Sequence, residues 1–320
     1  MLEATLFART SLSTLGEFLV TLVLGSILVF SSLHLSPGSP LATLSGGRAL
    51  TPEATAVLES RYGLDQPLWV QYFSWFGRAI KGDLGASIVY QSPVSTVIGQ
   101  GLQVSLVLLT LALIFIVVIG LILGFLSGLS GKGMDMFVGG LFSIGLALPA
   151  FVAAPLLIAV FAVALGWFPV IYDSSNPSNR QLILPSVAIA ISLIAFLGRL
   201  TRSNVISAAN TDVTDFARLR GLPPRRIIRT YILRPSLLGI TTSVGLTIGS
   251  LVGALIVVEV AFQLPGFGYF LIAAVNSRDY ALVQGMTIVL FLFILCLNTL
   301  IDFLNPFLDP RISRRTVVKS

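Results

Sequence analysis

Few side chains in this sequence are of the kinds that carry out covalent or metal chemistry. The 320 residues include one cysteine, Cys296, and one histidine, His34, which excludes a disulfide framework and a Cys/His metal cluster within the chain. No H-E-x-x-H motif occurs, and these two residues do not make a convincing nucleophile–base pair. The phosphate-binding pattern G-x-x-x-x-G-K-[ST] is absent as well. The sequence therefore argues against an intramembrane enzyme and against a nucleotide site in this chain.

Acidic side chains inside apolar segments are the remaining candidates, because an ionisable group in such a place is often functional. Glu17 lies near the end of its segment and can reach water. Glu259 could contact a solute, or it could hydrogen-bond to a neighbouring helix or to the turn Pro265–Gly268, and the second interpretation is preferred. Asp302 and Asn298 lie one helical turn apart. They either line an exit path or hydrogen-bond between helices.

Membrane-spanning helices must position these side chains. Hydrophobic residues make up 55% of the chain and charged residues only 11%, whereas soluble domains carry about 25% charged residues. Six apolar segments reach the roughly 20 residues that cross a bilayer. They run approximately over Leu15–Leu35, Leu102–Leu126, Met136–Leu165, Leu182–Leu200, Leu237–Phe262 and Leu282–Leu304. The third contains Pro149 and Pro155, so it is expected to be kinked or tilted.

The basic residues predict how these spans are oriented. With the N-terminus in the cytoplasm, 14 of the 20 lysines and arginines fall in cytoplasmic segments. The positive-inside rule therefore places both termini in the cytoplasm. Since topology accounts for the formal net charge of +6, nucleic-acid binding is not expected.

Polar stretches divide the chain into four expected parts. The order is a cytoplasmic N-terminus with the first span, a small external helical domain, a core of five further spans with a cytoplasmic loop at 201–235, and a cytoplasmic tail. Their bounds are 1–35, 36–99, 100–310 and 311–320.

The external stretch contains two helical patterns. Pro52 and Glu53 follow Thr51, an arrangement typical of a helix start. The second pattern, from Leu68 to Ile80, is rich in aromatic residues that suit a helix at a membrane interface. These residues are Trp69, Tyr72, Phe73, Trp75 and Phe76.

The loop 201–235 contains a short amphipathic helix. Asp212 is placed to cap it, Asp215 lies in its first turn, and Gly221 is placed to end it before Pro223-Pro224. One face, by i, i+3, i+4, i+7 spacing, is formed by Val213, Phe216, Ala217 and Arg220, with Leu219 beside it. So short a helix is marginal alone in water, so it must pack against something. Its arginines leave two interpretations open, anchoring to anionic lipid and docking on a cytoplasmic partner.

Sequence motifs in this loop resemble those of a known family. Asp215-Phe216-Ala217-x-x-x-Gly221, followed by the run Tyr231–Pro235, resembles the EAA loop of ABC-importer permeases. The run Ala217–Leu222 is similar to the A-R-A-K-G-L run of the dipeptide/oligopeptide/nickel branch, in its first permease subunit type. Other stretches with the same resemblance are Arg61–Leu68, Gly82–Ser87, Val257–Gly268, Arg278–Gly285 and Asp309–Ile312. The sequence departs from the family pattern at Asp215, a shorter acid than usual, at Phe216, which replaces an alanine, and at Ser39, which replaces an aspartate.

The resemblance implies an all-α polytopic membrane protein with the type I ABC-importer permease fold. In that family the loop forms a coupling helix that sits in a groove of an ATPase subunit. Coupling is thereby assigned to Asp215, Phe216, Ala217, Arg218, Leu219, Arg220, Gly221 and Leu222. We expect Phe216, Leu219 and Leu222 to supply the apolar contact, and Asp215 and nearby arginines to set the register.

The resemblance also implies partners and a location. No cofactor is expected in this chain, because ATP and Mg would be bound by two ATPase subunits. The other implied partners are a second permease forming a heterodimer, an external solute-binding protein and a peptide-like solute, in the inner membrane of a bacterium or archaeon. Dipeptides, longer peptides, nickel chelates and peptide-like metabolites all remain open as cargo, with peptides ranked first because the branch consists mostly of peptide importers.

Two rival functions fit the sequence less well. A secondary transporter would need ion-coupling groups at mid-membrane, where the six segments have few polar residues. A purely structural membrane subunit would leave the arginine-rich loop helix without a purpose.

Overall fold

The computed structural model describes residues 20–33, 35, 51–62 and 64–308, and this part of the chain contains helices and no β-strand. It divides into two compact units. The first contains the described residues up to Gln103 together with Pro265–Leu297, and the second contains Val104–Leu264 and the described residues from Asn298 onward. The described helices of the expected external domain, 36–99, belong to the first unit.

Long apolar helices confirm an all-α polytopic membrane protein, and the count of six spans stays a prediction. Within the described residues, four helices are long and apolar enough to cross a membrane, Val94–Leu129, Asn179–Ala209, Pro224–Ala261 and Tyr280–Leu297. A bent pair, Lys132–Ala147 with Ala150–Ala164, makes a fifth if it counts as one span. The first predicted span is described only in part, as the helix Val20–Leu33.

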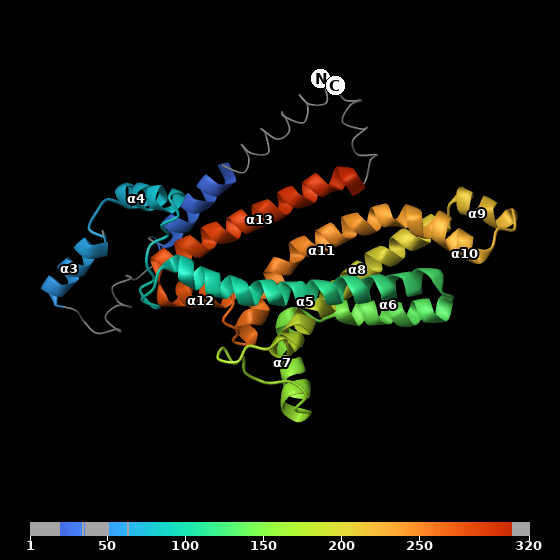
Figure 1. The fold of residues 1–320 in the computed structure, drawn as a ribbon, viewed down its shortest axis with the longest axis horizontal. Coiled ribbons are helices and arrows are strands. Elements are labelled where there is room, and N and C mark those ends of the chain that lie inside the picture. Colours follow the sequence, from blue (N-terminus) through green and yellow to red (C-terminus); the bar gives the residue numbers. More distant parts are fainter. Residues whose placement is uncertain (1–19, 34, 36–50, 63, 309–320) are drawn as a thin grey trace, which may run out of the picture. The chain divides into compact units, whose positions relative to one another are not determined.

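The third predicted span, Met136–Leu165, is broken sharply. Helix α6, Lys132–Ala147, ends just before Pro149, and the chain turns by 98° into α7, Ala150–Leu157, and the π-helix η1, Ile158–Ala164 (Figure 1). A proline disfavours the helical conformation of the residue before it, and Leu148 is extended, with ψ of 94°. Pro149 therefore marks a break between two helices, where the sequence predicted only a kink or tilt, and Pro155 lies inside α7.

Helix α8, Asn179–Ala209, is the central helix of the second unit. It packs against α6, α7 and α11, Arg234–Ala261. The helix α5, Val94–Leu129, also approaches α8 closely, through Gly120, Gly124 and Gly128 at four-residue intervals. Small residues let membrane helices approach closely, which is how this spacing positions α8.

We expect Gly124→Ala to destabilise the second unit by about 1–3 kcal/mol. An added Cβ would lie 2.6 Å from the Thr201 Cβ and 2.7 Å from the Gly198 carbonyl oxygen, so α5 would have to move away from α8. The measurement is the melting temperature of the purified protein. Gly139→Ala is the matched control, since an added Cβ there meets nothing within 4 Å. Equal melting temperatures for the two variants would contradict this packing.

The first unit contains α3, Pro52–Tyr62, α4, Leu68–Ile80, α12, Phe267–Ser277, and the first part of α13, Tyr280–Leu308. Its core includes the fully buried side chains of Val94, Leu282 and Met286.

The turn between α12 and α13 holds a buried carboxylate. Asp279 is fully buried and accepts hydrogen bonds from the Ser87 hydroxyl at 2.5 Å and the Val89 amide at 3.1 Å. Its other oxygen accepts from the Leu282 amide at 3.2 Å, which caps α13. One side chain therefore joins the 83–93 loop to the start of α13.

Candidate functional site

The loop between α8 and α11 forms the predicted short helix, α9, Asp212–Leu219. Its N-cap is Thr211, whose hydroxyl accepts a hydrogen bond from the Thr214 amide at 3.4 Å. The prediction that Asp212 caps the helix is therefore wrong by one residue, because threonine supplies the acceptor and Asp212 is the first helical residue. Asp212 and Asp215 both lie in the first turn, where acids are favoured by the helix dipole.

The C-terminal end of α9 confirms the predicted stop. Gly221 has a φ of +68°, and its amide donates to the Arg218 carbonyl at 2.9 Å. The Leu222 amide donates to the Ala217 carbonyl at 3.3 Å, which completes a Schellman-type end. Pro224 then begins α10, Pro224–Arg226, which continues into the π-helix η2, Ile227–Leu233.

The backbone of Gly221 gives a direct test of this end. We expect Gly221→Ala to cost about 1–2 kcal/mol, because a Cβ disfavours the left-handed conformation. Steric contact adds nothing, since a Cβ at Gly221 would meet no atom within 4 Å. Hydrogen exchange at the Leu222 amide reports the effect. Gly221→Asn should exchange more slowly than Gly221→Ala, since asparagine tolerates this conformation better. The reverse order would refute the assignment.

The inner side of α9 is fixed to its neighbours. Thr214 is fully buried, and its hydroxyl donates to the Ala208 carbonyl at 2.9 Å and lies 3.4 Å from the Tyr231 carbonyl. Ala217 is buried in a cluster with Val205 of α8 and with Ile227 and Ile232 of η2. The helix is therefore held to α8 and η2, at the C-terminal end of α8 and the N-terminal end of α11 (Figure 1).

The outer side of α9 is apolar and exposed. Val213, Phe216 and Leu219, three residues apart, are 63%, 58% and 86% exposed. The Arg220 guanidinium carbon lies 5.1 Å from the centre of the Phe216 ring, and Arg218 pairs with Asp215 at 2.8 Å on the surface. A short helix with one face fixed and one apolar face exposed is suited to bind in a groove of another protein.

Of the eight predicted coupling residues, Gly221 ends the helix, and the other seven fall into two groups. Five side chains are exposed on α9 or at its end, those of Asp215, Phe216, Arg218, Leu219 and Arg220. Ala217 instead points inward, and Leu222 is half-buried against the same cluster. Of the three residues expected to supply the apolar contact, Phe216 and Leu219 are exposed and Leu222 is half-buried, and Val213 is exposed beside them.

Sequence reasoning missed Thr214 and an ionic cluster near the loop. Arg202 of α8 binds both carboxylate oxygens of Asp135 of α6, at 2.5 and 2.7 Å, and the Ser127 hydroxyl of α5 donates to the same carboxylate at 2.6 Å. Such bidentate pairs are geometrically specific, so the cluster joins three helices. From the sequence, Arg202 was counted only among the basic residues predicted to lie in the cytoplasm. The sequence did contain a signal for the inward side of α9. Thr214 lies three residues before Ala217, on the side of the helix without large apolar residues.

Of the predicted pathway residues, only Glu259 has a described side chain. It is fully buried in α11 and accepts a hydrogen bond from the Ser105 hydroxyl of α5 at 2.5 Å. This contact is the interhelical role preferred from the sequence. Asn298 and Asp302 belong to α13, but their side chains lie outside the described residues, as do Glu17 and His34 entirely. Among the residues that are described, no three His, Cys, Asp or Glu side chains gather as a metal site.

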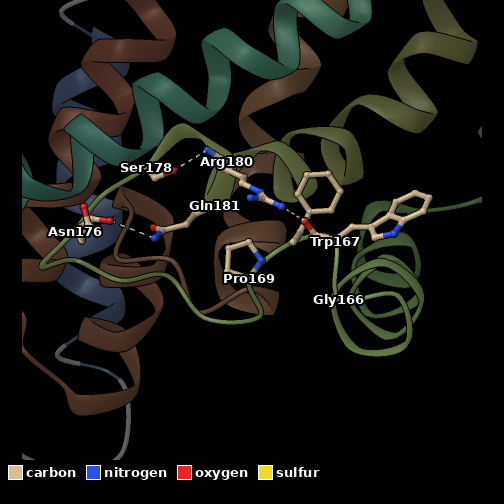
Figure 2. A pocket seen from close by; sticks show the side chains of 8 residues that line it. Gly166, Trp167, Pro169, Asn176, Ser178, Arg180 and Gln181 are labelled. Carbon is tan, nitrogen blue, oxygen red and sulfur yellow. Dashed lines mark hydrogen bonds between the residues drawn. The ribbon is translucent and has the colours of Figure 1, made fainter.

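An open cavity of about 450 Å³ lies beside the N-terminus of α8 (Figure 2). The Arg180 guanidinium donates to the Trp167 backbone carbonyl at 2.8 Å, and the Gln181 side-chain amide donates to the Asn176 backbone carbonyl at 3.3 Å. The Ser178 hydroxyl accepts from the Arg180 amide at 3.2 Å and caps the helix. These bonds hold the 166–178 loop against α8.

Comparison with known proteins gives matches along most of the chain. Residues 116–314 match the family described as "Binding-protein-dependent transport system inner membrane component", and residues 8–94 match the corresponding N-terminal family. A putative peptide transport system permease protein of Brucella suis is 33% identical over 307 residues, which cover 94% of this chain and 98% of the relative. The oligopeptide transport system permease protein OppB of Salmonella typhimurium is 34% identical over 298 residues, 92% of this chain and 96% of OppB.

A solved structure shares the fold. The crystal structure of an amino acid ABC transporter with histidines matches with a TM-score of 0.55 and 18% sequence identity, covering 66% of this chain and 94% of that chain. The family matches confirm the resemblance seen in the loop motifs. The chain is therefore a member of the family of inner-membrane permease components of binding-protein-dependent ABC transport systems.

Proposed function

We propose that this chain is one of two different permease subunits that together form the translocation pathway of an ATP-driven peptide importer. The observation that carries the proposal is α9, fixed through Thr214 and Ala217 and exposing Val213, Phe216 and Leu219. Relatives named for peptide and oligopeptide transport support peptides as the cargo class.

The proposed mechanism is alternating access driven from the cytoplasmic side. Two ATPase subunits bind ATP and Mg, and α9 docks in a groove of one of them. ATP can change the state of the permease only if the ATPases bind one state more tightly, since equal affinity shifts nothing. The fixed inner side of α9 supports transmission of its movement to α8, and the pair Arg202–Asp135 supports further transmission to α6.

The orientation belongs to the same proposal. Both termini and the α9 loop lie in the cytoplasm, and an external solute-binding protein delivers the cargo from the other side. The excess of basic residues in the segments assigned to the cytoplasm supports this arrangement.

Co-purification and reconstitution test the function together. The tagged chain, extracted gently from its native membrane, should bring with it a second polytopic permease and one or two ATPases that contain phosphate-binding loops. Vesicles containing this complex and its binding protein should accumulate peptides only when ATP is supplied. Recovery of the chain alone, or uptake driven by an ion gradient without ATP, would overturn the proposal. Uptake of a nickel chelate in place of peptides would overturn only the cargo.

A further inference from the structure

Helix α4 presents three chemically different sides. Tyr72 and Trp75, three residues apart, pack on the helix Val20–Leu33, where the Tyr72 and Ser26 hydroxyls are 2.8 Å apart. The rings of Tyr72 and Phe30 meet edge to face with centres 5.4 Å apart. Trp75, Phe30 and Ser26 are all buried, so this first side is an interior contact within the first unit.

The second side of α4 is a stripe of large apolar side chains. Trp69, Phe73 and Ile80 lie four and seven residues apart, which places them on one side of a helix. They are 67%, 66% and 72% exposed. The third side, which carries Ser74 and Arg78 four residues apart, is polar and also exposed.

The contacts with the helix Val20–Leu33 indicate the depth of α4. Phe30 and Ser26 lie five and nine residues before Leu35, which is still helical and is the last residue of the predicted first span. At 1.5 Å per residue, they are about 7.5 and 13.5 Å along the axis from that end. Interfacial amphipathic helices bury their apolar face about 5–10 Å into the boundary between headgroups and acyl chains. The contact of α4 with Phe30 therefore falls at this depth, and the contact with Ser26 lies about one turn deeper.

We propose that α4 is an anchor in the bilayer surface, with Trp69, Phe73 and Ile80 immersed among phospholipid acyl chains. The span that α4 touches also exposes apolar side chains, Leu24 by 61% and Leu28 by 65%, so the lipid-facing surface continues from the span. Tryptophan and phenylalanine suit this zone, because their rings are apolar and tryptophan adds a polar edge.

The polar side of α4 fits the same placement. Arg78 in the last turn and Lys81 directly after the helix are both exposed, at positions where basic groups can reach lipid phosphates. Each of the three sides then faces a matching environment, the span, the acyl chains and the headgroup region. The anchor would hold the 64–93 segment of the chain at the membrane surface.

Spin labels distinguish lipid from the other possible surroundings of this stripe. Because the chain has a single cysteine, the variants Trp69→Cys, Phe73→Cys and Ile80→Cys are made on a Cys296→Ala background and labelled with a nitroxide. Ser74→Cys is the matched control on the polar side of the same helix. The complete transporter is reconstituted in vesicles of phosphatidylethanolamine and phosphatidylglycerol. Collision of each label with oxygen, which concentrates in lipid, is compared with collision with a water-soluble nickel chelate.

The expected result is more frequent collision with oxygen than with the nickel chelate at positions 69, 73 and 80, and the opposite ratio at position 74. Infrequent collision with both reagents at the three apolar positions would show that another protein surface covers the stripe, and would overturn the proposal. Preferential collision with the nickel chelate there would show a stripe exposed to water, and would overturn it as well. Transport activity does not enter the measurement, so the result is independent of the proposed cargo and of ATP coupling.

Discussion

The variant Phe216→Ala is expected to reduce ATP-driven uptake about 30-fold while leaving the chain folded. Phe216 is more than half exposed in this chain, so its truncation removes little internal packing. In a complex with an ATPase, a central aromatic anchor of a helix-in-groove contact contributes about 2 kcal/mol or more, which corresponds to roughly 30-fold in affinity. The loss should appear in transport and in solute-stimulated ATP hydrolysis by the reconstituted complex, with ATPase subunits dissociating more readily.

The control for this prediction is Phe137→Ala. Phe137 of α6 is 64% exposed and Phe216 is 58% exposed, so the two variants remove the same kind of side chain at similar exposure. Phe137 lies far from α9 in the chain and is not among the proposed docking residues. Normal assembly and normal solute-stimulated hydrolysis in Phe216→Ala would remove Phe216 from the docking surface. Equal losses in both variants would indicate a general effect of exposed aromatic side chains.

A second large effect is expected from Asp279→Ala, on the stability of the first unit. The substitution leaves the Ser87 hydroxyl and the Val89 and Leu282 amides without their acceptor. The Ser87 hydroxyl and the Leu282 amide belong to buried residues, and each buried polar group without a partner costs about 1–3 kcal/mol, so a total loss of at least about 2 kcal/mol is expected. Amide exchange in the 83–93 loop and in the first turn of α13 should therefore accelerate by about 30-fold or more.

Two comparison variants make this prediction specific. Asp279→Asn keeps one carbonyl acceptor and should lose less than Asp279→Ala. Asp65→Ala removes an exposed carboxylate from the same unit and should leave exchange unchanged. The clamp would be disproved if exchange in the loop were no faster in Asp279→Ala than in Asp65→Ala.

The two predicted features that the structure bears out most directly are local in origin. The class of protein follows from composition, because so few charged residues cannot cover a soluble surface. The stop of α9 follows from Gly221 and the two prolines after it, since a left-handed residue ends a helix whatever surrounds it. The cap was predicted at Asp212 but lies at Thr211. Both residues can supply an oxygen acceptor, and the sequence alone does not choose between neighbours.

The roles of the buried polar groups depend on contacts between distant segments. Asp279 meets Ser87 across 192 residues, and Glu259 meets Ser105 across 154. No local preference predicts such pairs, since helix packing alone brings their donors and acceptors together.

The sequence by itself determined an all-α membrane permease with a short helix in the 201–235 loop that ends at Gly221, because composition, apolar length and backbone preference act within a few turns. Only the tertiary structure decided which side of that helix is exposed. Thr214 and Ala217 face inward because α8 and η2 bury them, which leaves Val213, Phe216 and Leu219 outward and Leu222 half-buried. The tertiary structure likewise gave Asp279 its three donors.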